Sequence, residues 1–191
     1  MAKINACVFI SGKGSNLRKL ILNSNNYNFP IKIKLVVCND KNAKGLKLAQ
    51  KWSIPCLLLD KNQRLSESKT LVELKAHKIK LILLAGYMRI LSPSFVKPWA
   101  GRLLNIHPSL LPEFPGAHAH RDVIKAGVSK SGCTVHFVDS GMDTGPIIAQ
   151  EVVDILPDDD EDSLAEKVKL KEHLLYPMVI DMLSSGKIKS P

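Results

Sequence analysis

The segment NIHPSLLP (105–112) places two polar side chains at the end of a hydrophobic run. Asn105 and His107 are two positions apart, so in a strand both side chains point to the same face. An amide can donate a hydrogen bond to an oxyanion, and an imidazole can carry a proton near neutral pH. The pair, followed at once by Pro108, therefore indicates an active site at a strand end. A structural role of the Asn105 side chain in a loop is the alternative.

A carboxylate that could act with this pair lies in the loop DSGMDTGP (139–146). Asp143 next to His107 would keep the imidazole charged near neutral pH. The chain has no GxSxG pattern and no cysteine in an expected loop, and acyl transfer to an amine requires no covalent intermediate. The three residues suit acyl transfer to an amine, in which Asn105 and His107 stabilise a tetrahedral oxyanion and His107 moves the proton. The reaction would then be a direct attack by the amine.

The segment SGKGSN (11–16) follows the first apolar run and precedes a helical pattern. Its two glycines allow backbone N–H groups to turn inward, Ser15 adds a hydroxyl, and Asn16 can cap the helix. The loop is therefore predicted to bind an anion, with a tight turn without a ligand as the alternative. Leu17 stands where a dinucleotide fingerprint has its third glycine, and the Walker pattern is absent. A single phosphate is favoured over a pyrophosphate.

Two other classes of function compete with acyl transfer. Asp40 follows the second apolar run, roughly where the ribose-binding acid of a dinucleotide enzyme would lie, so a NAD-dependent oxidoreductase is the runner-up. A nucleotide-binding module without catalytic activity is the third hypothesis. Quenching of tryptophan fluorescence by NADH would support the oxidoreductase, and turnover would exclude the silent module.

Three of the six histidines lie between positions 107 and 120, two of them in PGAHAH (115–120). A zinc site takes three or four ligands, often with a carboxylate and a second shell of hydrogen bonds. The HxH pair alone is weak support for such a site, so the sequence predicts no metal. The alternative ligand set is His107, His118 and His120. The remaining histidines are interpreted as surface or structural residues: His77, His136 and His173.

The composition is that of an ordinary globular protein. The chain has 191 residues, 45% hydrophobic and 24% charged, which predicts a single domain over residues 1–191. A run of about 18 apolar residues, as a membrane span needs, is absent, and the N-terminus lacks a signal-peptide pattern. We therefore expect a cytoplasmic protein without a membrane partner.

The net charge of +9 suggests an anionic partner or a lysine-rich solvated surface. Aromatic residues make up only 5% of the chain and the lysines are scattered, so a small anionic molecule is favoured over nucleic acid. The cysteines show no zinc-type spacing and lie in apolar runs. They are predicted to be reduced thiols of the core: Cys7, Cys38, Cys56 and Cys133.

Short aliphatic runs alternate with amphipathic stretches, which is typical of a doubly wound α/β fold with a mostly parallel sheet. The expected parallel strands are 4–10, 33–38, 55–59, 81–85 and 102–106. Two further strands, 133–138 and 146–155, are expected to be antiparallel at the sheet edge. The acidic run 158–162 is expected to lead into a long C-terminal helix at about 162–184. Such sheets bind ligands beyond the carboxyl ends of their strands, where Asn105 and His107 lie.

Five longer segments carry a family resemblance. They are GxGSNL near the start, LAGYMRILSPSFV (84–96), GRLLNIHPSLLPEFPGAHAH (101–120), GCTVHFVDSGMDTGPI (132–147) and KEHLLYPMVI (171–180). In this order, over nearly the whole chain, they resemble the phosphoribosylglycinamide formyltransferases, the glycinamide ribonucleotide branch of the folate-dependent formyltransferases. The NxHxSLLP element is common to the whole family, whereas PGAHAH and SGKGSN are typical of this branch. The segment 60–80 departs from the pattern.

The resemblance implies a Rossmann-like formyltransferase fold and transfer of a formyl group from the co-substrate 10-formyltetrahydrofolate to the amine of glycinamide ribonucleotide, in de novo purine biosynthesis. The residues it implies to be catalytic are Asn105, His107 and Asp143. Those it implies for ribonucleotide binding are Gly12, Lys13, Gly14, Ser15, Asn16 and Glu172. Those it implies for folate binding are Arg64, Met88, Arg89, Ile90, Leu91, Asn105, Val138, Asp139, Gly141 and Asp143.

The partners implied are two small molecules, a ribonucleotide monophosphate and a reduced folate. The related methionyl-tRNA formyltransferases carry a further RNA-binding domain, and the formyltetrahydrofolate hydrolases a regulatory domain. Neither is expected here. The choice between a monomer and a homodimer is left open.

Overall fold

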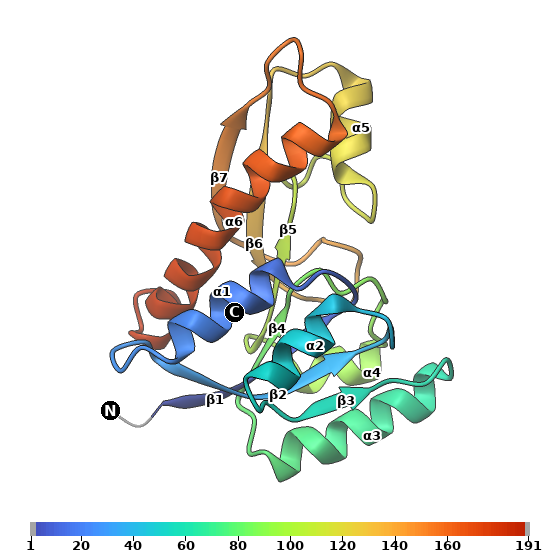
Figure 1. Ribbon diagram of the computed structural model, residues 1–191, viewed down its shortest axis with the longest axis vertical. Helices are drawn as coiled ribbons and strands as arrows, with labels where there is room; N and C mark the ends of the chain where they lie inside the picture. Colours follow the sequence, from blue (N-terminus) through green and yellow to red (C-terminus); the bar gives the residue numbers. More distant parts are fainter. Residues whose placement is uncertain (1–2, 190–191) are drawn as a thin grey trace.

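The computed structural model describes residues 3–189, which contain one seven-stranded sheet (Figure 1). The strands are β1 (Ile4–Ile10), β2 (Ile31–Cys38), β3 (Cys56–Leu58), β4 (Leu81–Leu84), β5 (Leu103–His107), β6 (Lys130–Phe137) and β7 (Ile147–Asp154). Their order across the sheet is β3-β2-β1-β4-β5-β6-β7. The first five strands run parallel, whereas β6 pairs antiparallel with both β5 and β7. The predicted doubly wound sheet with antiparallel edge strands is confirmed.

Helices cover both faces of this sheet. They are α1 (Ser15–Ser24), α2 (Lys44–Lys51), α3 (Gln63–Ala76), α4 (Pro93–Val96), α5 (Ala119–Ala126) and α6 (Glu161–Ser184), with the 3₁₀ helix η1 (Lys97–Trp99) directly after α4. One core lies between the sheet and α1, α2, α5 and α6, and a second lies between the sheet and α3 and α4. Successive strand residues alternate between them, since Val8 belongs to the first core and Phe9 to the second.

The chain reverses its direction across the sheet after β3. From β1 it proceeds outward through β2 and β3, and it then adds β4 and β5 on the other side of β1. The loops after β1 and β4 therefore diverge at the carboxyl ends of these strands, where doubly wound sheets bind ligands. Ser11 N, in the loop after β1, donates to Gly86 O in the loop after β4 at 3.1 Å. Two of the predicted functional segments thus meet at this edge, next to the end of β5.

The long helix α6 begins within the acidic run. Asp160 is its N-cap and accepts a hydrogen bond from Ser163 N, while Ser163 Oγ accepts one from Asp160 N. Further along, the Tyr176 hydroxyl lies 3.0 and 3.2 Å from backbone carbonyl oxygens of β4 and β5. α6 is thereby fixed against the two strands that carry the predicted site. The predicted helix at about 162–184 is confirmed, with Glu161 as its first residue.

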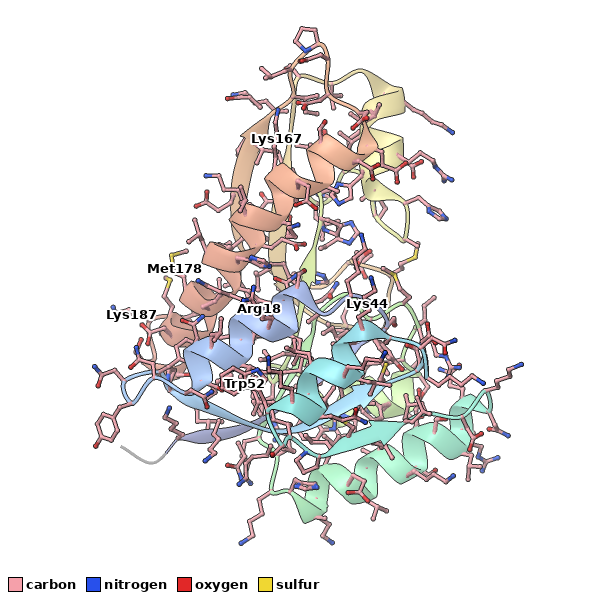
Figure 2. All side chains as sticks on the ribbon, in the orientation of Figure 1. Arg18, Lys44, Trp52, Lys167, Met178 and Lys187 are labelled. Carbon is pink, nitrogen blue, oxygen red and sulfur yellow. The ribbon has the colours of Figure 1, made fainter. Side chains whose placement is uncertain are left out.

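Basic side chains project from several elements of the surface. Figure 2 labels Arg18 on α1, Lys44 on α2 and Lys167 on α6, which lie well apart in that view.

Within residues 3–189, no helix is both long enough and apolar enough to cross a bilayer.

The prediction that all four cysteines belong to the core is wrong for Cys56. The thiols of Cys7, Cys38 and Cys133 are free and buried, and burial raises the pKa of Cys133 to about 12. Cys56 is also free but exposed, on the three-residue strand β3. Among residues 3–189, β3 is the last strand on its side of the sheet, so no further strand flanks it there.

Candidate active site

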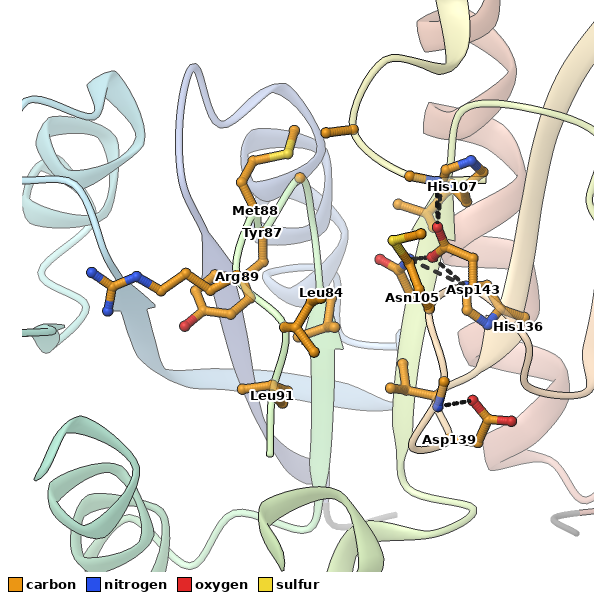
Figure 3. Close-up of a pocket in the computed structure, with 18 of the residues that line it drawn as sticks. Leu84, Tyr87, Met88, Arg89, Leu91, Asn105, His107, His136, Asp139 and Asp143 are labelled. Carbon is orange, nitrogen blue, oxygen red and sulfur yellow. Dashed lines mark hydrogen bonds and ion pairs between the residues drawn. The ribbon is translucent and has the colours of Figure 1, made fainter. Parts of the chain in front are cut away.

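Asn105 and His107 lie on the same face of β5 and line a cavity of about 280 Å³ (Figure 3). The loops that follow β4 and β6 supply most of its other walls. Asp143 reaches both residues, because its Oδ2 is 3.3 Å from His107 Nδ1 and its Oδ1 is 3.3 Å from Asn105 Nδ2. The structure thus brings together the three side chains that were predicted to be catalytic.

Asp143 is held by its own backbone conformation and by a neighbouring loop. Its φ of 57° is in the left-handed region, which aspartate and asparagine adopt more readily than most residues. Its Oδ2 accepts a hydrogen bond from Gly116 N at 2.9 Å. Burial alone would raise the pKa of Asp143, but the nearby His136 ring, 3.6 Å from Oδ1, the hydrogen bond from Gly116 N and the nearby His107 lower this pKa to about 2. The carboxylate is therefore ionised across the neutral range.

His107 is buried, and its Nε2 lies 2.9 Å from Phe114 O. A carbonyl oxygen only accepts, so Nε2 carries a proton. Burial lowers the pKa of His107 below its ordinary value, and the Phe114 carbonyl and Asp143 raise it by less. The prediction that Asp143 keeps this imidazole charged near neutral pH is therefore wrong, because burial is the larger effect. With its pKa lowered, His107 can exchange a proton at Nδ1, which lies 3.3 Å from Asp143 Oδ2.

His136 belongs to the same cluster, although the sequence suggested only a surface or structural role. In the antiparallel β5–β6 pair it stands opposite Asn105. His136 Nδ1 lies 2.8 Å from Phe137 O and so carries the proton, which leaves Nε2 to accept from Asn105 Nδ2 at 3.2 Å. The amide of Asn105 is thereby oriented by two acceptors, His136 Nε2 and Asp143 Oδ1. The contact depends on the strand register, which the sequence does not give.

The loop 11–16 turns sharply into α1. Gly14 is the N-cap with a φ of 77°, and a Cβ at this position would come within 2.8 Å of Gly45 Cα, so only glycine fits. Lys13 is exposed and Ser15 is partly buried at the start of the helix. Because Gly14 provides no capping side chain, an anionic ligand can take that role at the positive end of the helix.

The Asn16 side chain does not cap α1, contrary to the interpretation of the sequence. It is buried and donates from Nδ2 to Glu172 Oε2 on α6 at 2.8 Å. Burial raises the pKa of Glu172 to about 7, against the opposing effects of Asn16 and Lys169. A carboxyl group that titrates near neutral pH therefore lies beside the loop 11–16.

Glu172→Gln is expected to stabilise the protein at alkaline pH. The folded-state pKa of Glu172 is about 7 and its ordinary value is 4.5, so between these values the folded protein retains a proton that the unfolded chain has lost. Wild-type stability therefore decreases with rising pH in this window, whereas the variant, whose amide oxygen still accepts from Asn16, shows no such decrease. The free energy of unfolding should be nearly the same for the variant and wild type near pH 4, and about 1–3 kcal/mol higher for the variant above pH 8. Urea unfolding across this pH range measures the difference in free energy of unfolding. A difference that does not change with pH would contradict the raised pKa of Glu172.

Most residues that were predicted to bind the folate line the cavity. They are Met88, Arg89, Ile90, Leu91, Val138, Asp139 and Gly141. Arg64 is not among them, since it lies exposed in the first turn of α3. The structure instead places Arg89 at the cavity, with a side chain that extends away from Asp143 (Figure 3). Arg64 fell in the segment that departs from the family pattern, where residue positions transfer poorly.

The histidines of PGAHAH lie at the start of α5. His118 is the N-cap residue and His120 is in the first turn. Burial lowers the pKa of His120, and its Nδ1 is buried without a hydrogen-bond partner among the described residues. Within residues 3–189, no group of three or more His, Cys, Asp or Glu side chains is arranged to hold a metal ion. That the reaction needs no metal stays a prediction.

A family model described as formyl transferase matches residues 4–180, a range that contains the loop 11–16 and all four residues of the cluster at Asn105. The chain belongs to the formyl transferase family. The predicted family and the class of enzyme, a transferase, are thereby confirmed. The alternative hypothesis of a NAD-dependent oxidoreductase, which the glycine-rich loop and Asp40 had suggested, is set aside.

Individual relatives agree with this family. The chain is 38% identical to the phosphoribosylglycinamide formyltransferase of Bacillus subtilis, with 92% of each protein covered, and 39% identical to that of Escherichia coli, with 97% of this chain and 90% of the relative covered. It is 45% identical to the trifunctional purine biosynthetic protein adenosine-3 of Drosophila melanogaster, but it spans only 14% of the length of that protein. The crystal structure of phosphoribosylglycinamide formyltransferase from Brucella melitensis is 39% identical over the full length of both chains, with a TM-score of 0.91.

Proposed function

We propose that this formyl transferase family member moves the formyl group of 10-formyltetrahydrofolate to the primary amine of glycinamide ribonucleotide, in de novo purine biosynthesis. The observation that carries the proposal is the cluster of Asn105, His107 and Asp143 in one cavity, next to a loop suited to a single phosphate. The relatives named phosphoribosylglycinamide formyltransferase support it. We place the protein in the cytoplasm. Its proposed partners are small molecules, without a nucleic acid, membrane or metal partner, and it would act as a monomer or a homodimer.

The reduced folate would occupy the cavity between the loops after β4 and β6. The side chains of Met88 and Ile90 are 65% and 67% exposed, so a ligand there would bury apolar surface that now faces solvent. The formyl group would point toward Asn105 and His107 at the inner end, and the polar end of the folate would extend past Arg89 toward solvent.

The ribonucleotide would bind with its phosphate at the N-terminus of α1 and its amine toward the cluster. The loops after β1 and β4 touch through Ser11 and Met88, since Met88 N donates to Ser11 Oγ at 2.7 Å, so the two sites adjoin. Glu172 is linked to the phosphate loop through Asn16 and can accept hydrogen bonds from the glycinamide part. Its pKa of about 7 lets it ionise when a polar donor replaces the apolar surroundings.

The geometry supports direct transfer. The amine nitrogen attacks the formyl carbon, the carbonyl electron pair moves to the oxygen, and Asn105 Nδ2 donates to this oxyanion. Asn105 Nδ2 contacts His136 Nε2 at 3.2 Å and Asp143 Oδ1 at 3.3 Å in the ligand-free site, so the oxyanion would replace one of these acceptors.

Proton transfer then completes the reaction. The attacking nitrogen loses its proton to His107 Nδ1, and ionised Asp143 stabilises the imidazolium that forms. The bond between the formyl carbon and N10 of the folate breaks, and His107 returns the proton to N10. The products are the formylated amine and tetrahydrofolate, and the enzyme is restored without a covalent intermediate.

The proposal is tested with the purified chain and both substrates, by following the absorbance change that accompanies loss of the formyl group from the folate. We expect turnover that requires both substrates and saturates with each. Turnover of the folate without the ribonucleotide would indicate a hydrolase instead.

Ser15→Asp should raise the KM for glycinamide ribonucleotide by about 100-fold, with little change in the KM for the folate. The variant places a carboxylate at the start of α1, where the phosphate is proposed to bind, and two anions at one helix N-terminus repel each other. Ser15→Ala is the matched control and should raise the same KM by only about tenfold or less, because it removes one hydroxyl and adds no charge. Parallel changes in both KM values would mean that the loop serves the fold and not one substrate.

A further inference from the structure

We propose that Glu67 of α3 is a positioning residue for the folate side of the cavity, because its carboxylate holds the backbone of the segment 88–92 in place. This inference rests on the proposed function. The segment carries four cavity-lining residues and has no regular secondary structure. Leu91 is buried, but Met88 and Ile90 are largely exposed, so side-chain packing alone does not fix the segment.

Glu67 makes two hydrogen bonds with Ser92 at the end of this segment. Ser92 N donates to Glu67 Oε1 at 2.8 Å, and Ser92 Oγ donates to Glu67 Oε2. Ser92 is also the N-cap of α4, where its Oγ accepts from Phe95 N at 3.2 Å. One carboxylate therefore fixes both the end of the cavity wall and the start of the next helix.

Gln63, one turn earlier on α3, extends the same network. Its Nε2 donates to Ile90 O at 2.8 Å and to Glu67 Oε1 at 3.1 Å. Arg89 Nη1 also donates to Asp60 O, just before α3, at 2.6 Å. The backbone of the segment is thus held by hydrogen bonds to side chains of α3, and not by pairing with a β-strand.

The opposite end of the segment has its own anchor. Met88 N donates to Ser11 Oγ at 2.7 Å, and Ser11 Oγ donates to Asn39 Oδ1 at 2.6 Å. The segment is therefore held at Met88 by the loop after β1 and at its other end by α3. Loss of the α3 contacts should free residues 89–92 while leaving the ribonucleotide side of the site in place.

Steady-state kinetics of the full chain with both substrates tests this role. Glu67→Ala should raise the KM for 10-formyltetrahydrofolate by about fivefold to tenfold, with kcat and the KM for the ribonucleotide within about twofold of wild type. Glu67→Gln should have a folate KM close to that of wild type, because its amide can accept from Ser92 N and donate to Ser92 Oγ. Glu73→Ala is the matched control, since Glu73 lies on the same helix and pairs with His77, 3.5 Å away, away from the cavity.

Amide hydrogen exchange of the ligand-free protein provides a readout that does not depend on activity. Exchange in residues 89–92 should be about tenfold faster in Glu67→Ala than in wild type, and unchanged in Glu73→Ala. Unchanged exchange and an unchanged folate KM would overturn the inference, and so would equal increases in both KM values. If the wild-type chain transferred no formyl group, the proposed function would fail, and the exchange data alone would still decide the role of Glu67.

Discussion

Asp143→Asn is expected to lower kcat by about 100-fold or more, with much smaller changes in both KM values. The interaction of Asp143 with His107 strengthens when the imidazole takes the proton of the attacking amine, so its loss raises the barrier more than it weakens substrate binding. Asparagine suits the left-handed backbone at this position and can still accept from Gly116 N, so the loop should keep its shape. Steady-state kinetics with both substrates measures the effect.

The same variant should lower the pKa of His107 further. Burial already lowers this pKa, and Asp143 is one of the two groups that raise it, so removal of the negative charge leaves burial less opposed. NMR titration of the imidazole in wild type and variant measures the shift. Asp139→Asn is the matched control, because Asp139 lies in the same loop and lines the cavity without contacting His107. A higher His107 pKa in Asp143→Asn would refute the assigned role, as would an unchanged kcat.

Asn105→Leu should lower kcat by about 10²–10³-fold, because it removes the donor that is proposed to meet the oxyanion. Leucine has a similar shape but no N–H group, so the formyl oxygen would lose its partner as charge develops. His136 Nε2 would also lose its donor, which should cost about 1–3 kcal/mol of stability.

A comparison of variants separates the loss of the donor from the loss of stability. His136→Phe removes the acceptor that orients Asn105 but keeps the Asn105 amide, and should lower kcat less than Asn105→Leu does. Thermal unfolding of both variants shows whether each is folded at the assay temperature. If Asn105→Leu retained kcat and only the KM for the folate rose, Asn105 would be a binding residue and not an oxyanion donor.

The fold and the central residues could be predicted because local patterns determine them. Alternation of aliphatic runs with amphipathic stretches indicates parallel strands and covering helices, and the i, i+2 spacing of Asn105 and His107 places both on one face of β5. The role of Asp143 could be proposed because Asn105 and His107 lack a carboxylate that would stabilise the imidazolium. These inferences depend on neighbours in sequence or on general rules of sheet topology.

The remaining features depend on contacts between distant segments. His136 stands opposite Asn105 only because of the β5–β6 register, and Asn16 turns inward only because Glu172 of α6 is there to accept its hydrogen bond. The pKa of His107 depends on a balance between burial and a nearby charge, and the sequence shows the charge but not the burial.

Isotope tracing tests the central claim, direct formyl transfer to the amine, most directly. The chain is incubated in H₂¹⁸O with glycinamide ribonucleotide and 10-formyltetrahydrofolate labelled with ¹³C in the formyl group, and the products are analysed by mass spectrometry. Direct attack predicts one ¹³C-formyl group on the ribonucleotide for each tetrahydrofolate formed, with no ¹⁸O in that group and no labelled formate in solution. Labelled formate in place of formylated ribonucleotide, or ¹⁸O in the transferred group, would contradict the account.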